Sequence, residues 1–125
     1  MRSILFKAKK LSDGKWVKGS LVKTPFGTFI EWYEDSICNK REVDTDTVCQ
    51  STGLKDCDGK EIWEGDMLSN VTNDSPDGIV VFKYGAFSLL AKNGRDFCVA
   101  LTYLLSEKDS LNRFKVVGNK FDKEK

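Results

Sequence analysis

The sequence predicts a mainly β protein, a β-rich α+β fold containing a small β-barrel, and three observations support this fold class. Apolar and polar residues alternate with a period of two in many short runs, which is typical of half-buried strands. Glycine-containing turn signals separate these runs at short intervals. Only residues 101–109 have leucines at helical spacing, so one short helix is expected. Many short strands with a single helix indicate a barrel or a packed pair of sheets.

Residues 1–51 are predicted to form an N-terminal β subdomain that begins with a hairpin. Strands are expected at residues 4–9, 16–22 and 28–33, where the period-two pattern or the content of β-branched and aromatic residues favours extended backbone. Residues 34–42 are mostly polar and are interpreted as a loop. Residues 43–48 contain two aspartates and fit either a short edge strand or a helical turn.

Residues 52–121 are predicted to form a barrel that resembles SH3-like barrels, capped by the N-terminal hairpin subdomain. A turn at residues 64–66 leads into a strand, and three meandering strands and a late return strand follow. The strand patterns cover residues 67–71, 79–84, 86–91, 96–100 and 114–121. Residues 72–78 carry the strongest loop signal, so mobility is expected there. The short helix is expected to plug one barrel end, and residues 122–125 form a solvated tail.

The stretch from residue 52 to residue 68 organises the chain, because three glycines, Gly53, Gly59 and Gly65, punctuate it as turns. Asp58 and Gly59 form a dipeptide typical of tight hairpin turns. Asp66 follows Gly65 and is expected to accept hydrogen bonds from backbone N–H groups there. These five residues are therefore interpreted as a structural turn motif.

This stretch also resembles the YopX family of phage and prophage proteins. Residues 52–56 read Thr-Gly-Leu-Lys-Asp, and after a turn residues 59–66 read Gly-Lys-Glu-Ile-Trp-Glu-Gly-Asp. Residues 4–8 are similar to the opening strand of the family, residues 80–87 to a strand pair and residues 116–119 to its closing motif. The chain departs from the family pattern at Lys9, where relatives usually have Trp, and at residues 49–51. The resemblance implies one YopX-like domain over residues 1–125 and a phage context in a bacterial host; the family has no established activity, so no mechanism follows.

Composition excludes some function classes and leaves others open. A formal net charge of +1 gives no global field to attract a polyanion, so nucleic-acid binding would need a local basic patch. No apolar run approaches the length that spans a bilayer, so a soluble, cytoplasmic protein without membrane contact is expected. In that compartment thiols stay reduced, and the four cysteines, Cys38, Cys49, Cys57 and Cys98, are interpreted as free.

Catalytic chemistry has little support because the chain contains no histidine. Histidine is the commonest general base and a common zinc ligand, and the cysteines form no C-x-x-C pair. The acidic residues between 56 and 66 place their glycine at the wrong position for an EF-hand loop. The sequence thus predicts no catalytic, cofactor or metal site. A carboxylate-based enzyme is the remaining catalytic alternative, with Glu31 and Glu34, or Glu61 and Glu64, as its acid/base pair.

The residues that favour binding are aromatic side chains interleaved with lysines. They are Trp63, Trp32, Tyr33, Trp16, Tyr84, Lys60 and Lys83. Tryptophan and tyrosine anchor protein interfaces, whereas aromatic residues beside lysines can also stack and hold single-stranded nucleic acid. Packing in the core with lysine stems alongside is the third interpretation of the same set.

The sequence therefore favours a non-catalytic protein-binding or self-associating module. Its expected partner is an unidentified phage or host protein, or a second copy of the chain. A single-stranded nucleic-acid binder is the alternative. The protein-binding hypothesis expects exposed apolar surface around Trp63 or Trp32.

Overall fold

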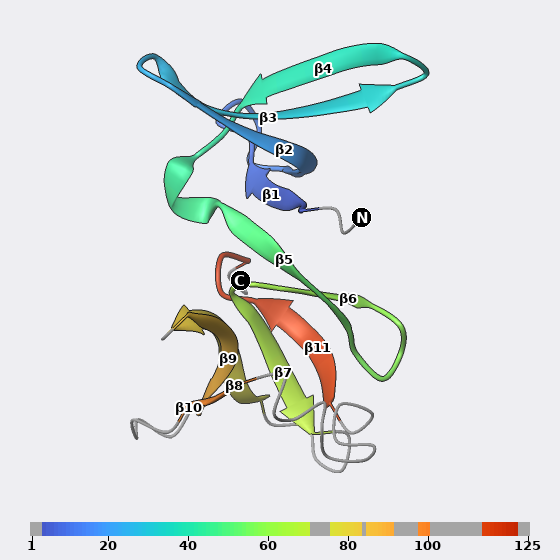
Figure 1. Cartoon of the computed structure of the whole chain (residues 1–125), viewed down its shortest axis with the longest axis vertical. Helices are drawn as coiled ribbons and strands as arrows, with labels where there is room; N and C mark the ends of the chain where they lie inside the picture. Colours follow the sequence, from blue (N-terminus) through green and yellow to red (C-terminus); the bar gives the residue numbers. More distant parts are fainter. Residues whose placement is uncertain (1–3, 71–75, 84, 92–97, 101–113, 123–125) are drawn as a thin grey trace. The chain divides into compact units, whose positions relative to one another are not determined.

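The computed structural model describes residues 4–70, 76–83, 85–91, 98–100 and 114–122, and the described chain is mainly β (Figure 1). Its strands form two antiparallel sheets, with the hydrogen-bonded orders β4-β3-β2-β1-β5-β6 and β10-β9-β8-β7-β11. The predicted mainly β class is confirmed, whereas open sheets replace the predicted closed barrel. The chain divides into two compact units, Met1–Ser51 and Thr52–Lys125, and the boundary falls within strand β5 (Cys49–Lys55).

In the first unit, strand β2 (Trp16–Thr24) pairs with two different strands. Its first half pairs with β1 (Phe6–Lys9), and its second half pairs with β3 (Gly27–Glu34). The change of partner occurs at Gly19, where an added Cβ would overlap the carbonyl oxygen of Glu31. Glycine is thus required by the close approach of two backbones.

The core of the first unit lies on one face of these strands. Its buried centre consists of Ala8, Ile30 and Val43. Five partly buried side chains pack against that centre: Phe6, Val17, Leu21, Trp32 and Val48. Alternate residues along β3 therefore point into this core or away from it.

The prediction of a loop over residues 34–42 was wrong, because residues 37–42 form strand β4 (Ile37–Glu42). Strand β4 pairs with β3 from Phe29↔Glu42 to Glu34↔Ile37 without a register shift. Asp35 and Ser36 form the two-residue turn between them, with φ angles of 51° and 69°. Two successive positive φ angles are the pattern of type I′ turns, whose twist matches that of the strands.

Residues 43–48, which fitted an edge strand or a helical turn, contain the 3₁₀ helix η1 (Thr45–Thr47). The Asp44 carboxylate accepts a hydrogen bond from the backbone N–H of Asp46 and caps this turn. The Thr47 side chain is buried and accepts a hydrogen bond from the backbone N–H of Lys9 at 2.9 Å. The helical turn thus fixes the backbone between β4 and β5.

The second unit contains the strands that the sequence predicted as a meander with a late return. They are β7 (Asp66–Asn70), β8 (Pro76–Lys83), β9 (Ala86–Ala91), β10 (Cys98–Ala100) and β11 (Phe114–Asn119), and the short strand β6 (Glu61–Trp63) precedes them. Strands β7 to β10 pair in sequence order, and β11 returns to pair with β7. The buried centre of this unit consists of Ile62, Leu68 and Val80.

Four predictions for the second unit concern residues that lie wholly or partly outside the described ones. The expected helix at 101–109 and the side chain of Tyr84 lie outside them. Most of the expected loop at 72–78 also lies outside, and β8 begins at Pro76, three residues before the predicted start at Ile79. The side chain of Cys98 is likewise not described, although its backbone pairs with Leu90.

The type I′ turn generates a prediction about stability. Ser36 has a positive φ angle of 69°, which glycine adopts without a steric cost. We expect Ser36→Gly to raise the free energy of unfolding by about 0.5 to 1 kcal/mol. Denaturant titration followed by circular dichroism measures this change. Ser20→Gly, in the middle of β2, is the control and should lower stability; an equal loss in both variants would contradict the turn assignment.

Candidate interaction site

The buried carboxylate of Asp56 holds the turn between β5 and β6. Its Oδ1 accepts hydrogen bonds from the backbone N–H groups of Asp58 at 2.9 Å and Lys60 at 2.8 Å. Its Oδ2 accepts a third bond, from the backbone N–H of Val116 at 2.8 Å. The sequence assigned this role to Asp58, but Asp58 is exposed and occupies the turn that Asp56 organises. Gly59 has a φ angle of 81°, as its place in the turn requires.

The buried carboxylate of Asp66 performs a similar task at the next turn. Its Oδ2 accepts the backbone N–H of Trp63 at 2.7 Å, and its Oδ1 accepts the Asn119 amide at 2.9 Å. Asp66 therefore bonds to a backbone N–H before Gly65, rather than after it as expected. Gly65 itself has a φ angle of 89° and accepts the backbone N–H of Lys120 at 2.9 Å. Both carboxylates are occupied by structural hydrogen bonds, which disfavours a catalytic or metal-binding role for them.

The predicted aromatic set does not form one exposed surface. The side chain of Trp63 is only 3% exposed. Trp32 is half-buried against the core of the first unit, and its indole Nε1 donates to Glu34 at 3.3 Å. Tyr33 is 68% exposed and, as the next residue along β3, points to the opposite face.

Trp16 is half-buried, and two ammonium groups contact its ring. The Nζ atoms of Lys7 and Lys9 lie 4.5 and 5.4 Å from the ring centroid. Lysine ammonium groups at such distances are attracted by the ring quadrupole. Lys60 and Lys83 are exposed in the second unit.

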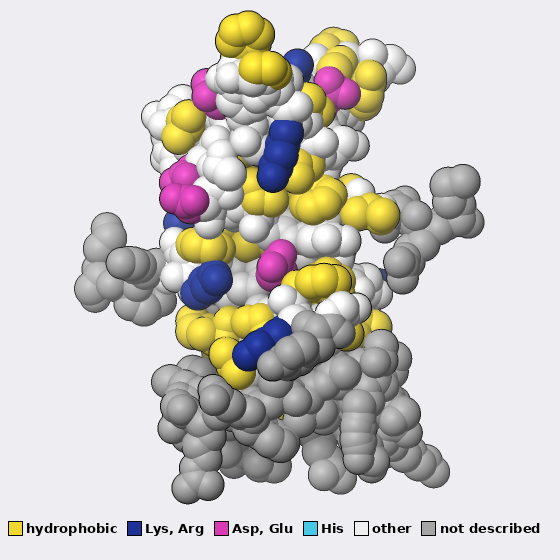
Figure 2. Space-filling model, turned by 60° about the vertical axis from the view of Figure 1, so that its left-hand side comes forward, with side chains coloured by type: hydrophobic (Ala, Val, Ile, Leu, Met, Phe, Trp, Pro, Cys, Tyr) yellow, Lys and Arg dark blue, Asp and Glu magenta, His cyan; other side chains and the backbone are white. Residues whose placement is uncertain are grey.

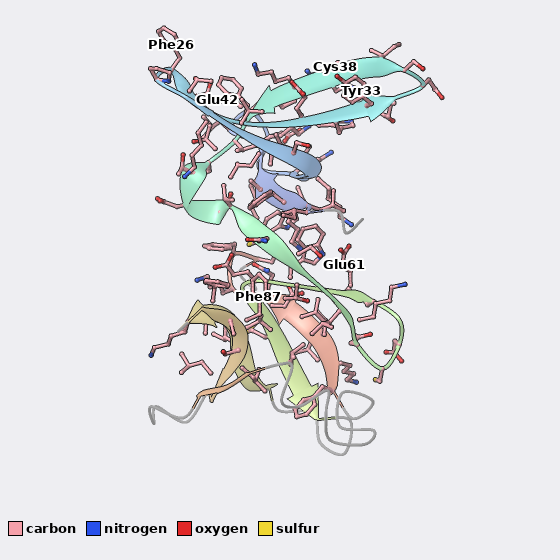
Figure 3. The ribbon with its side chains drawn as sticks, in the orientation of Figure 1. Phe26, Tyr33, Cys38, Glu42, Glu61 and Phe87 are labelled. Carbon is pink, nitrogen blue, oxygen red and sulfur yellow. The ribbon has the colours of Figure 1, made fainter. Side chains whose placement is uncertain are left out.

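Among the described residues, the most exposed large apolar side chains lie at the two ends of the β2-β3-β4 region. Phe26 is 90% exposed, Tyr33 68% and Ile37 65%. Phe26 projects from the turn between β2 and β3, and Tyr33 lies beside Cys38 near the turn between β3 and β4 (Figure 3). On the face that Figure 2 shows, hydrophobic side chains reach the surface in several groups, with charged side chains between some of them. These two turns are the candidate interaction site.

The Phe26 turn is held in one geometry by its neighbours. The Thr24 hydroxyl accepts the backbone N–H of Phe26 at 3.0 Å and donates to the Gly27 carbonyl at 3.2 Å. Gly27 has a φ angle of 150°, and an added Cβ would lie 2.6 Å from a carboxylate oxygen of Glu42. The apolar ring of Phe26 is therefore presented by a backbone that is already ordered.

Tyr33 and Cys38 are directly opposite each other in the β3–β4 register, and both are exposed. Their side-chain hydrogen bond is the main cause that raises the pKa of the Tyr33 hydroxyl, so the neutral phenol is favoured. Ile37 is the next residue along β4 and points to the other face. The end of this hairpin thus presents apolar atoms on both faces.

The two carboxylate pairs that a carboxylate-based enzyme would use lie in different units of the chain. Glu31 and Glu34 are three residues apart on β3, so their side chains point to opposite faces of the strand. Glu61 and Glu64 are half-buried.

Within the residues that the structure describes, no group of three Cys, Asp or Glu side chains is placed to hold a metal ion. The described part of the chain also contains no helix of the length and apolarity that crossing a membrane requires.

Sequence reasoning missed Phe26 and Ile37. Phe26 follows Pro25 at the centre of a turn signal, where a polar residue is usual. A phenylalanine at such a position is the sequence feature that could have indicated an exposed apolar side chain. Ile37 was assigned to a loop, so its exposure on a strand was not considered.

A family model described as YopX protein matches residues 5–124, nearly the whole chain. The comparison with curated proteins found no match to this chain.

The Asp56 turn generates a second prediction. The Asp56 carboxylate accepts three backbone N–H groups with its two oxygens. An asparagine in its place has one acceptor oxygen, and its NH₂ group would face a backbone N–H, so at least one buried N–H group would lose its acceptor. We expect Asp56→Asn to lower the free energy of unfolding by about 2 kcal/mol. Asp58→Asn, two residues away and exposed, should change it by less than about 0.5 kcal/mol. Urea denaturation of both variants measures the difference, and equal stabilities would refute the role of Asp56.

Proposed function

The chain belongs to the YopX family, and from this premise we propose that it is a phage or prophage protein that binds another protein in the cytoplasm of a bacterial host and catalyses no reaction. One observation carries the proposal: the most exposed large apolar side chains, Phe26, Tyr33 and Ile37, stand on two tight turns of the same three strands. Aromatic side chains on ordered backbone are typical anchors of protein interfaces.

The energetics of Phe26 support this proposal. Burying a phenylalanine side chain contributes about 1.5 to 3 kcal/mol relative to leaving it in water. The chain forgoes that stabilisation, since Phe26 is 90% exposed, and an apolar pocket on a partner would supply it. The Thr24 hydrogen bonds already order the turn, so binding orders little additional backbone.

The nucleic-acid alternative has less support. It uses the aromatic side chains of the predicted set as stacking platforms, but the Trp63 side chain is buried and Trp32 packs against the core, whereas Tyr33 is exposed. The ammonium groups of Lys7 and Lys9 already contact the ring of Trp16. A base that stacked on that ring would displace at least one of them.

For the second unit we retain the SH3-like strand order as part of the proposal. The consecutive pairing of β7, β8, β9 and β10, with β11 returning beside β7, supports it. In this proposal the second unit supplies a stable scaffold, and the turns of the first unit supply the contacts.

Partner capture with matched variants tests the proposed function. We expect the double variant Phe26→Ser/Tyr33→Ser to fold normally. It should recover specific bacterial or phage proteins at least about tenfold less well than the unchanged chain does, because each interface anchor contributes about 2 kcal/mol or more to the binding free energy. Leu11→Ser, which removes another apolar side chain that is 59% exposed, is the control and should recover them equally. Quantitative mass spectrometry after crosslinking measures the ratio.

Two outcomes would contradict the proposal. The first is equal recovery by the double variant and the unchanged chain. The second is a gain in mass on adding a mixed single-stranded oligonucleotide, seen by light scattering at low salt and lost at high salt, which would favour nucleic-acid binding.

A further inference from the structure

The turn that carries Phe26 has a backbone twist that does not by itself suit a hairpin. Strands β2 and β3 pair up to Thr24↔Gly27, so Pro25 and Phe26 are the two central residues of the turn. Proline holds its φ angle at about −65°, and the φ angle of Phe26 is also negative. Two-residue hairpins favour turns whose first central φ angle is positive, because the twist of such turns matches that of the strands. The Phe26 turn therefore depends on further interactions to hold its geometry.

The Thr24 side chain supplies these interactions. Its hydroxyl accepts the backbone N–H of Phe26 at 3.0 Å and donates to the Gly27 carbonyl at 3.2 Å, so one oxygen atom joins both sides of the turn. Gly27 has a φ angle of 150°, which side chains rarely adopt, and from this residue the pairing with β2 continues without a register shift. One hydroxyl group thus fixes the backbone from which the Phe26 side chain projects (Figure 3).

The other turn of the candidate interaction site is built differently. Asp35 and Ser36 have φ angles of 51° and 69°, so this turn has the type I′ twist that suits a hairpin. Tyr33 and Ile37 are therefore positioned by the pairing of β3 with β4 itself. Of the two turns, the one at Phe26 is the one whose order depends on a side-chain hydroxyl.

We propose that Thr24 is the positioning residue of the Phe26 turn: its hydroxyl keeps Phe26 in the orientation in which an apolar pocket of a partner protein binds the ring. A partner binds only the fraction of molecules that have the competent orientation, so the apparent affinity falls in proportion to that fraction. The net loss of one hydrogen bond changes an equilibrium of this kind by about fivefold. Thr24 thus acts through Phe26. The inference rests on the proposed protein-binding function and names the residue that controls its principal contact.

Two substitutions at position 24 separate the hydroxyl from the rest of the side chain. Thr24→Val removes the hydroxyl and keeps the β-branched shape that favours a strand. Thr24→Ser keeps the hydroxyl and is the matched control. The bond to the Phe26 N–H lies at the exposed surface, so water can replace the lost acceptor and Thr24→Val should still fold. Circular dichroism and thermal unfolding establish that both variants are folded.

NMR relaxation of backbone ¹⁵N in the full chain measures the order of the turn without any partner. We expect the order parameter of the Phe26 amide to fall from about 0.85 to below about 0.6 in Thr24→Val and to stay high in Thr24→Ser. The order parameter of Tyr33 should be unchanged in both variants. Among the proteins that the unchanged chain recovers, Thr24→Val should recover about fivefold less and Thr24→Ser about the same amount.

Three results would overturn the inference. The first is an unchanged order parameter of Phe26 in Thr24→Val, which would make any loss of capture a direct contact of the hydroxyl. The second is an equal loss in Thr24→Ser. The third is full capture by Thr24→Val although Phe26 has lost its order; if Phe26→Ser/Tyr33→Ser still loses capture, the proposed function stands and the positioning role alone is refuted. Equal capture by that double variant and the unchanged chain refutes the proposed function, and the inference with it.

Discussion

Two buried carboxylates, those of Asp56 and Asp66, hold the second unit together. Each joins the glycine-containing motif to the last strand: Asp56 to the backbone of Val116, and Asp66 to the side chain of Asn119. These bonds connect residues that are 60 and 53 positions apart in the chain. An ionised acceptor forms stronger hydrogen bonds than a neutral one, and its loss leaves buried N–H groups without a partner. The motif at residues 52–68 and the closing motif at 116–119 are therefore two halves of one structural arrangement.

This arrangement changes how the acidic residues of the chain are understood. Carboxylates near glycine turns suggest a metal loop or an acid/base pair when only the sequence is considered. Here the oxygens of Asp56 and Asp66 accept backbone N–H and amide groups, so these two carboxylates are committed to the fold. In the proposed function, the contacts with a partner come instead from the first unit, at the turns beside Phe26 and Tyr33.

Much of the fold could be predicted, because alternation and glycine turns report directly on strands that have one buried face. Strands β1, β2, β3, β7, β8, β9 and β11 all follow that pattern. Strand β4 does not, since almost all of its side chains are exposed and its turn uses Asp35 and Ser36 where glycine or asparagine is usual. The binding residues were harder to predict. A large aromatic side chain in a strand fits a core position and a surface position equally well. The sequence pattern alone therefore does not distinguish Trp63, which is buried, from Tyr33, which is exposed.

Strands β4 and β11 protect their outer edges in different ways. Lysine and arginine on an edge strand prevent identical edges from pairing, which is a common protection against aggregation. In β4 these cations stand beside carboxylates, since Glu31 is directly opposite Lys40 and Glu42 follows Arg41. Strand β11 needs no such protection, because Asp56 and Cys57 already occupy its outward groups. The contrast between the two edges is thus chemical: hydrogen bonds from the turn at Asp56 cover part of the edge of β11, whereas charged side chains line the edge of β4.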